Sequence, residues 1–438
     1  MRYWALLSIP FSILVGASCD KLWSGSIIDC GGAGFPCPEG YSPDMPLSES
    51  DGGMNTSDAG QGSDQGTTAN TDMRPAGPSD YTAVYTMSDI GRTTLVGTSD
   101  GRILTYNGSG STLVFMSERS SEPGVAVVGL WRGSFDISAT VVDLTIATPK
   151  TNKYYTYVGI NAGVPHPIGN TINSLWVDRA NGNNNESIGG TAKGYIAASN
   201  GNIYETILNT ALNSMPDSIQ TYSFSSNSHI NAIGGLQTPG KTMSNTVCDP
   251  PCLNIAWAAG DSGKLYYRDN ANWNELLITI GTISNTDRFL GIASKPSNNG
   301  GAAPVTAIGI GGVFAERSPG DAGMWLATSN PFGTQTMNSV CYFDSNSEVW
   351  AVGTNGAIYQ YLSYSIMGMP AGWRRIMPTN ISKDLSKVNL LAVHCAAPTG
   401  AAMSQRSRRV TIVGSNNTLF YGEDVSMMGV GYTWTQVE

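Results

Sequence analysis

The chain has 438 residues, of which 52 are glycine and only 13% are charged. Long helices need runs of Ala, Glu, Lys and Leu, and the sequence lacks such runs, so its composition predicts short strands and many turns. The formal net charge is −9, and most of this charge lies before residue 80. Nucleic-acid binding relies on Lys and Arg that neutralise phosphates, so this charge balance argues against a nucleic-acid partner.

The first residues have the features of a secretory signal. Arg2 is followed by an apolar run over 5–17, which is shorter than the roughly 20 residues that a membrane span needs. Small residues directly before Cys19 resemble a bacterial lipobox, so we predict a signal peptide over 1–18 and lipidation of Cys19. The alternative is ordinary cleavage nearby, with Cys19 a plain thiol. Either way we expect export to the periplasm or the cell surface, and the lipid would anchor the protein to the membrane.

Two segments separate this start from the body of the chain. The lipidated N-terminal segment, 19–42, contains a small loop closed by Cys30 and Cys37, which we expect to form a disulfide. Residues 43–79 are acidic and rich in Gly, Ser and Asp. Because this stretch has almost no apolar side chain to bury, it is predicted to be a disordered linker.

The cysteine count fits an oxidising compartment. Seven cysteines are present, and lipidation of Cys19 leaves an even number for pairing. Cys248 and Cys252 flank a short Asp-Pro-Pro loop and are expected to pair. Only three histidines occur, and four zinc ligands at suitable spacing are missing. We therefore expect no metal ion and no cofactor.

Beyond residue 80 a pattern recurs, in which an apolar stretch ends in a small residue and is followed by Gly, polar residues, a second Gly and another strand. Copies occupy 95–106, 196–206, 258–268, 307–317, 351–361 and 412–422. Gly, Asn and Asp in short connectors are typical of hairpins, because they tolerate positive φ. The missing copy is expected in 143–159, with its turn at 149–152.

Two further elements accompany these copies. A hydrophobic–Asn–x–hydrophobic element precedes several of them, and a Trp follows four of them, near the start of a last strand. Each repeat thus reads as four strands over roughly 50 residues, which is typical of a β-propeller. We count blades that start near 81, 126, 172, 230, 288, 337 and 388. The fold class is therefore all-β, a single propeller of about seven four-stranded blades over 80–438, with six or eight blades as the alternatives. Because every repeat contains its own four strands, the ring is expected to close with no borrowed strand or only a short one.

One blade carries a family resemblance. The stretch MNSVCYFDSNSEVWAVGTNGAIYQY (337–361) resembles a blade of the photosystem II assembly factor-like propellers, a group that also includes BNR-type and sortilin-like propellers. This resemblance implies the fold and says little about function. The sialidase Asp-box is not matched, since its nearest counterpart (318–325) has the wrong spacing, so no functional residues are carried over.

The repeated asparagines are the candidate binding residues. They are expected to begin the innermost strands, at one mouth of the central channel, where their amides would face a ligand or a Ca²⁺ ion. The alternative is that each side chain caps a backbone turn at the start of its strand. The four tryptophans of the last strands are expected to pack between blades rather than to form a sugar-stacking platform. The asparagines are Asn173, Asn231, Asn338 and Asn389, and the tryptophans are Trp273, Trp325, Trp373 and Trp434.

Two other groups of residues lead to predictions. Cys341 lies three residues after one repeat Asn and Cys395 six after another. This offset is about 10 Å along a strand and reverses the face, so we predict two separate thiols. The cluster Arg406, Arg408 and Arg409 is expected to form a solvated loop.

These observations favour a binding or scaffold module of the cell envelope, with an envelope protein or a polysaccharide as its partner and no catalytic residues. Long insertions at 179–194, 237–253, 294–304 and 397–409 are expected to gather on one face, where recognition residues tend to lie. The alternative is a carbohydrate-active enzyme, a hydrolase or lyase on a propeller frame. Such an enzyme would need an acid-rich pocket at a mouth of the channel.

Overall fold

The computed structural model separates residues 1–69 from a second unit, Asn70–Glu438. The residues that it describes lie in the second unit, between 79 and 437. The gaps are 88–92, 109–112, 138–139, 160, 179–186, 189–191, 209–218, 225–227, 236–255, 269–271, 277–282, 295–303, 318–324, 327–329, 344–347, 364, 366–369, 397–407 and 425–430. The predicted signal peptide, lipidation site, linker up to residue 78 and both small cysteine loops therefore lie outside the described residues.

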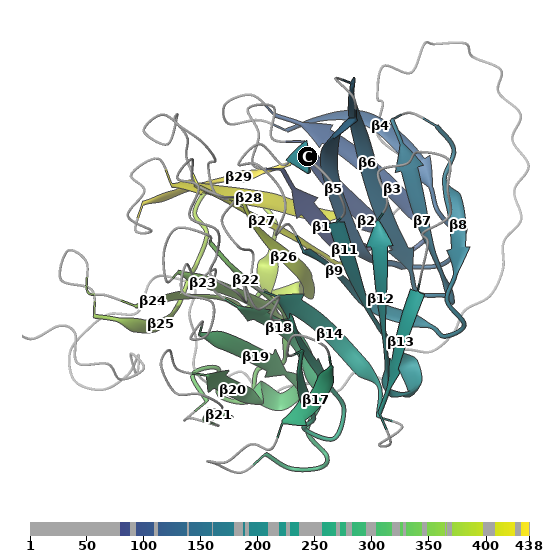
Figure 1. Cartoon of the computed structure of the whole chain (residues 1–438). Helices are drawn as coiled ribbons and strands as arrows, with labels where there is room; N and C mark the ends of the chain where they lie inside the picture. The colour runs from purple at the N-terminus through teal and green to yellow at the C-terminus, as the bar shows by residue number, and fades with distance from the viewer. Residues whose placement is uncertain are drawn as a thin grey trace, which may run out of the picture. The chain divides into compact units, whose positions relative to one another are not determined.

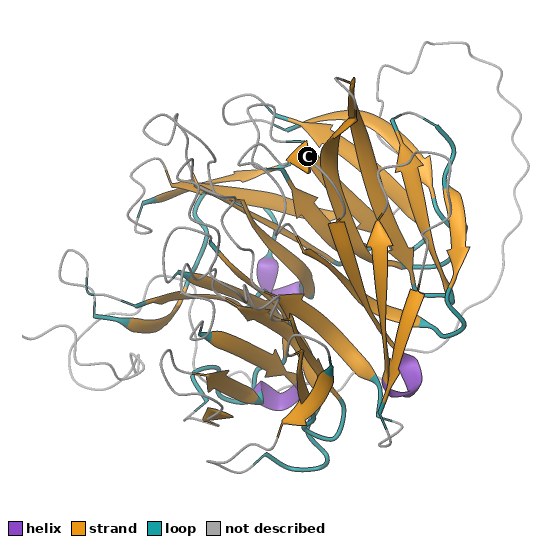
Figure 2. Ribbon diagram, viewed as in Figure 1, coloured by secondary structure: helices purple, strands orange, loops and turns teal. Residues whose placement is uncertain are grey.

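The second unit is an all-β propeller of seven antiparallel blades, as Figures 1 and 2 show. Blade 1 comprises β1 (Tyr81–Thr86), β2 (Thr94–Thr98), β3 (Arg102–Asn107) and β4 (Val114–Ser120). Blade 2 comprises β5 (Val127–Ile137), β6 (Thr140–Pro149), β7 (Lys153–Val158) and β8 (Val164–Pro167). Blade 3 comprises β9 (Ile172–Asp178), β11 (Ala192–Ala198), β12 (Asn202–Leu208) and β13 (Ile219–Ser223). The short β10 (Ser187–Ile188) lies between β9 and β11 in the chain, but it pairs in parallel with β5 and forms the fifth strand of blade 2.

The remaining blades follow the same order. Blade 4 comprises β14 (Ile230–Gly235), β15 (Ala256–Gly260), β16 (Leu265–Arg268) and β17 (Trp273–Leu276). Blade 5 comprises β18 (Phe289–Ser294), β19 (Val305–Gly309), β20 (Phe314–Arg317) and β21 (Trp325–Leu326). Blade 6 comprises β22 (Met337–Tyr342), β23 (Val349–Gly353), β24 (Ile358–Leu362) and β25 (Gly372–Arg375). Blade 7 comprises β26 (Leu390–Ala396), β27 (Arg408–Gly414), β28 (Thr418–Asp424) and β29 (Tyr432–Gln436). Three one-turn 3-10 helices complete the described elements, namely η1 (Ser199–Gly201), η2 (Ile310–Gly312) and η3 (Leu385–Lys387), and none of the described helices is long and apolar enough to cross a membrane.

The innermost strand of each blade contacts the innermost strands of both neighbours, and the series β1, β5, β9, β14, β18, β22, β26 returns to β1. This closed series confirms seven blades and excludes six or eight. The predicted blade starts near 81, 126, 172, 230, 288, 337 and 388 all fall within two residues of an observed first strand. The degenerate second copy is a complete blade, and its turn lies at 150–152 as predicted.

The turns between second and third strands have the predicted backbone chemistry. Gly101 adopts φ +90°, and a Cβ there would lie 2.0 Å from the carbonyl oxygen of Glu122. Gly356 adopts φ +65°, and a Cβ there would lie 2.3 Å from the carbonyl oxygen of Leu385. Asn417 takes the corresponding place in the last blade with φ +54°, because Asn tolerates the left-handed region better than most other residues.

The tryptophans of the outermost strands pack between blades, which confirms the prediction made for them. Each ring contacts an aromatic ring of the preceding blade, within the range of favourable aromatic pairs. The centroid separations are 6.2 Å for Trp273 and Tyr195, 5.7 Å for Trp325 and Trp257, 6.1 Å for Trp373 and Phe314, and 5.8 Å for Trp434 and Trp350.

Blades 7 and 1 meet without sharing a strand, which confirms the predicted closure. We call this contact the closing seam. Thr86 of β1 donates its backbone N–H to Nδ1 of His394 (3.2 Å), and its hydroxyl lies 2.9 Å from that of Thr411. An apolar cluster that includes Val84 and Tyr421 spans the same seam.

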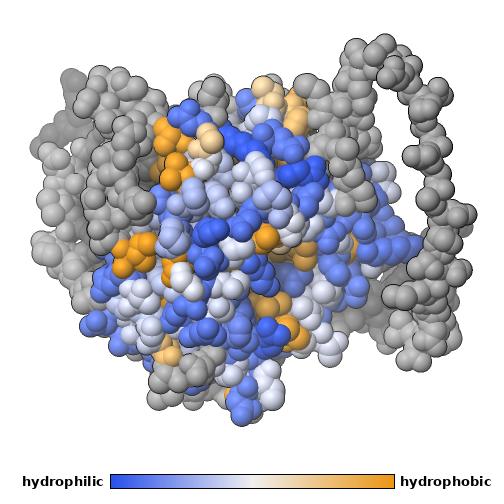
Figure 3. Space-filling view, turned by 90° about the vertical axis from the view of Figure 1, so that its right-hand side faces the viewer, coloured by the Kyte–Doolittle hydropathy of each residue, from blue (hydrophilic) through white to orange (hydrophobic). Residues whose placement is uncertain are grey.

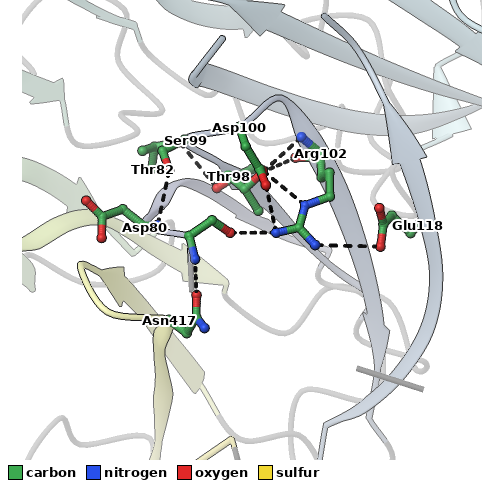
Figure 4. A network of polar contacts seen from close by, with 10 residues as sticks. Asp80, Thr82, Thr98, Ser99, Asp100, Arg102, Glu118 and Asn417 are labelled. Carbon is green, nitrogen blue, oxygen red and sulfur yellow. Dashed lines mark hydrogen bonds and ion pairs between the residues drawn. The ribbon is translucent and has the colours of Figure 1, made fainter. Parts of the chain in front are cut away.

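A polar network extends the closing seam to the turn of blade 1 (Figure 4). The Ser79 backbone N–H donates to Asn417 Oδ1 at 2.8 Å, and Arg102 donates to Ser79 Oγ at 2.7 Å. Arg102 also forms an ion pair with Asp100 at 2.8 Å. Desolvation raises the pKa of Asp100, but hydrogen bonds from Arg102 and Thr98 and the Arg102 charge outweigh it, so that the pKa lies below its usual value.

We expect Asp100→Asn to lower the melting temperature at neutral pH, and the difference from the wild type to shrink in acid. Because the folded-state pKa is depressed, the stabilisation is present above the unfolded value of about 3.9. It is lost as the pH falls through the folded-state value. Melting curves recorded between about pH 7 and pH 2 check this. A difference that stays constant down to the lowest pH would contradict it, and Glu118→Gln, which alters a more distant partner of Arg102 at 4.0 Å, is the control.

Candidate functional site

A cavity of about 370 Å³ lies on the central axis and is lined by the innermost strands of all seven blades. Its polar side chains are mostly amides and hydroxyls, and its aromatic side chains include Tyr85, Trp131 and Trp176. Among the described residues the lining contains no Asp, Glu, Lys or Arg. Such a lining suits recognition by hydrogen bonds and by apolar contact rather than by charge.

Three of the four candidate asparagines line this cavity and also connect neighbouring blades. Their side-chain amides donate to a backbone carbonyl of the next innermost strand, with Asn173 bonded to Ile230, Asn231 to Phe289 and Asn338 to Leu390 at 2.8, 2.9 and 2.8 Å. Asn231 alone also reaches the turn of its own blade, at Asp261 Oδ1 (2.7 Å). The amide groups therefore join successive blades at the cavity wall, a role that the sequence pattern did not indicate.

Asn389 does not share this position. Met337 pairs with Gly353 and Leu390 pairs with Gly414, and in both strands the register shifts directly afterwards. The residue equivalent to Asn338 is therefore Leu391, which lines the cavity. Asn389 is exposed before the strand begins, and its backbone N–H donates to Ser415 Oγ at 3.0 Å.

Asn231→Ala should destabilise the protein by about 1–3 kcal/mol, because the Phe289 carbonyl and the Asp261 carboxylate each lose one donor in a partly buried place. Urea denaturation measures this change. Asn389→Ala is the matched control, and its exposed position should keep the change within about 0.5 kcal/mol. Equal effects of the two substitutions would contradict the connecting role.

The prediction of two separate thiols is wrong, because Cys341 and Cys395 form a disulfide with their Cα atoms 5.7 Å apart. Counted from Met337 and Leu390, which hold the same place in their strands, the offset between the two cysteines is one residue rather than three. Opposite faces of neighbouring sheets meet in a propeller. An odd offset therefore directs the two side chains towards each other, whereas we expected it to separate them.

The prediction of a solvated basic loop is also wrong for Arg408 and Arg409, which are fully buried on β27. Arg408 forms an ion pair with the buried Glu348 of blade 6, and Arg409 pairs with Glu423 at 2.8 Å. Arg409 also lies 4.4 Å above the ring centroid of Tyr421. The two arginines begin β27 and run directly into its apolar residues with no Gly or Pro between, and this continuity is the signal that favours burial. Arg406 lies outside the described residues.

Glu348 accepts from several donors at the contact between blades 6 and 7. Trp350 Nε1 and the Tyr432 hydroxyl both lie 2.8 Å from Glu348 Oε1, and Gln360 and Arg408 donate to the same carboxylate. Burial, followed by the charge of Glu348, raises the pKa of Tyr432 well above its usual value. No local sequence pattern indicates this network, because its members come from two blades.

The two mouths of the cavity differ in their surroundings. The connections between second and third strands are uniformly short, at 99–101, 150–152, 199–201, 261–264, 310–313, 354–357 and 415–417. Those between first and second strands, at the opposite ends of the same strands, include the long segments 179–191, 236–255, 295–304 and 397–407. We call the end with the long connections the insert mouth. The predicted insertions connect first and second strands, but most of their residues lie outside the described ones, and the structure places only the strand ends that they join at this mouth.

Blade 2 extends the wall of the insert mouth. Its hairpin of β5 and β6 is longer than those of the other blades, and β10 pairs with it at Ser134 and Phe135. On the outer side of blades 1 to 3 the described surface is mostly hydrophilic, with small, separate hydrophobic patches (Figure 3). The long hairpin of β5 and β6 and the added strand β10 thus both lie at the insert mouth.

The described residues contain no group of three His, Cys, Asp or Glu side chains placed to hold a metal ion. No family model matches the chain, and no curated protein matches it.

Proposed function

We propose that this protein is a binding or scaffold module of the cell envelope, exported and anchored by a lipid on Cys19. The insert mouth would contact the partner, an envelope protein or a polysaccharide. The observation that carries the proposal is the difference between the two mouths, with short turns at one and long connections at the other. Variable loops on a rigid scaffold are where recognition residues tend to lie.

The uncharged cavity supports binding over catalysis. Glycoside hydrolysis needs two placed carboxylates, and the described lining has none. The likeness of residues 337–361 to the photosystem II assembly factor-like, BNR-type and sortilin-like propellers supports a place in that group. These residues cover the first three strands of blade 6.

Export has support from the disulfide, because stable disulfides form mainly in oxidising compartments. Lipidation is tested by labelling cells with an alkyne-bearing fatty acid. Cys19→Ser should abolish the label and release the protein into the soluble fraction, whereas Cys30→Ser should leave both unchanged. Undiminished labelling of Cys19→Ser would contradict the anchor.

Partner binding is tested by crosslinking the full chain in the cell envelope. A variant in which a short Gly-Asn turn replaces 236–255 should lose its crosslinked partner while keeping its melting temperature. Lys150→Glu, on a short turn at the opposite mouth, is the control and should keep the partner. An unchanged set of partners without the insertion would contradict the proposal.

A further inference from the structure

One strand of the last blade, β26, contacts both neighbouring blades through its opposite faces. Cys395 faces blade 6 and forms the disulfide with Cys341. The next residue back, His394, faces blade 1 and accepts the N–H of Thr86. Adjacent strand residues point to opposite faces, so the disulfide and the closing seam act on the same short piece of chain.

The rest of the contact between β22 and β26 is non-covalent. The Val393 backbone N–H donates to Ser339 Oγ at 3.2 Å, and Asn338 donates to the carbonyl of Leu390 at 2.8 Å. Among the described strands none is exchanged across the closing seam. In the described part of the ring, the disulfide is thus the one covalent bond, besides the chain itself, that holds blade 7 in place.

The disulfide is also within reach of a small reagent. Both cysteines are only partly buried, and both line the central cavity. No charged side chain of the described lining would repel an incoming thiolate. A cavity of about 370 Å³ is large enough for a small dithiol.

We propose that the Cys341–Cys395 disulfide is a redox-controlled lock on the ring, opened by thiol–disulfide exchange from the cavity. A dithiol reagent attacks one sulfur as its thiolate, forms a mixed disulfide and releases the other cysteine, which takes up a proton. The second thiol of the reagent then displaces the remaining cysteine and forms the reagent's own disulfide. The protein disulfide gains two electrons and the dithiol loses them. Reduction removes the covalent link between β26 and β22 and thereby loosens the closing seam. This inference does not depend on the proposed binding function.

Hydrogen exchange of the folded full-length protein, with and without dithiothreitol, tests the proposal. Reduction should speed amide exchange in β26, β27 and β1 by at least about tenfold more than it speeds exchange in β9 to β20. Alkylation and peptide mapping should label Cys341 and Cys395 under native conditions. Absence of labelling until the protein unfolds, or an equal increase in all blades, would overturn the lock.

Two variants separate the lock from general loosening. Cys341→Ser with Cys395→Ser should show the fast exchange without reagent, and dithiothreitol should then cause no further change in blade 7. If dithiothreitol still speeds exchange in blade 7 of this variant, the lock is overturned, because the effect then belongs to cysteines outside the described residues. Ser339→Ala removes a hydrogen bond across the same contact but keeps the disulfide, so it should still respond to the reagent.

Discussion

Glu348→Ala should lower the free energy of unfolding by about 3–5 kcal/mol, the usual cost of removing one partner of a buried ion pair. The side chains of Glu348 and Arg408 are each 1% exposed, so Arg408 would stay buried after losing its ion pair with Glu348. Trp350 and Tyr432 would lose an acceptor as well. Urea denaturation at neutral pH measures the change.

Controls for Glu348 come from within the chain. Glu118→Ala removes a carboxylate whose side chain is 40% exposed beside Arg102, and it should cost less than about 1 kcal/mol. Glu348→Ala combined with Arg408→Met should recover part of the loss, because the buried Arg408 charge that paired with Glu348 is then removed as well. A double variant less stable than either single variant would contradict this account. So would a free energy of unfolding of Glu348→Ala within about 1 kcal/mol of the wild-type value.

Removal of the disulfide by Cys341→Ala and Cys395→Ala should cost about 4 kcal/mol. The two cysteines are separated by 54 residues, and the chain-entropy model assigns a loss of this size to a loop of that length. Denaturant unfolding of the oxidised protein checks the value. The wild type in dithiothreitol should approach the variant, whereas Ser339→Ala should lose only about 1 kcal/mol. Equal stability of oxidised and reduced wild type would contradict the prediction.

The repeat made the architecture predictable from the sequence. Turns such as those at Gly101 and Gly356 need backbone conformations that few residues accept, so their positions recur visibly. Strand starts such as Ile230 follow from the hydrophobic–Asn–x–hydrophobic element that precedes several copies of the turn. Both signals are local, and the sequence therefore predicted the number of blades and the way the ring closes.

The contacts between blades were not predictable in the same way. The residues around Asn389 match the hydrophobic–Asn–x–hydrophobic element of the other copies, but their strand begins only at Leu390, after η3. A shift of this kind changes which residues meet across the contact, and it hid the pairing of Cys341 with Cys395. The burial of Arg408 depends on Glu348 in another blade, and no local pattern reports such a partner.

The closing seam has a consequence for the order of the blades along the chain. Each blade supplies its own four strands, and the two ends of the described chain meet, since Ser79 bonds to Asn417 and Val437 packs in the same apolar cluster as Val84. Circular permutants that join these ends and open the chain at 224–229, between blades 3 and 4, would break no sheet. We therefore expect such permutants, in which blade 7 lies in the middle of the chain, to form the same seven-bladed propeller.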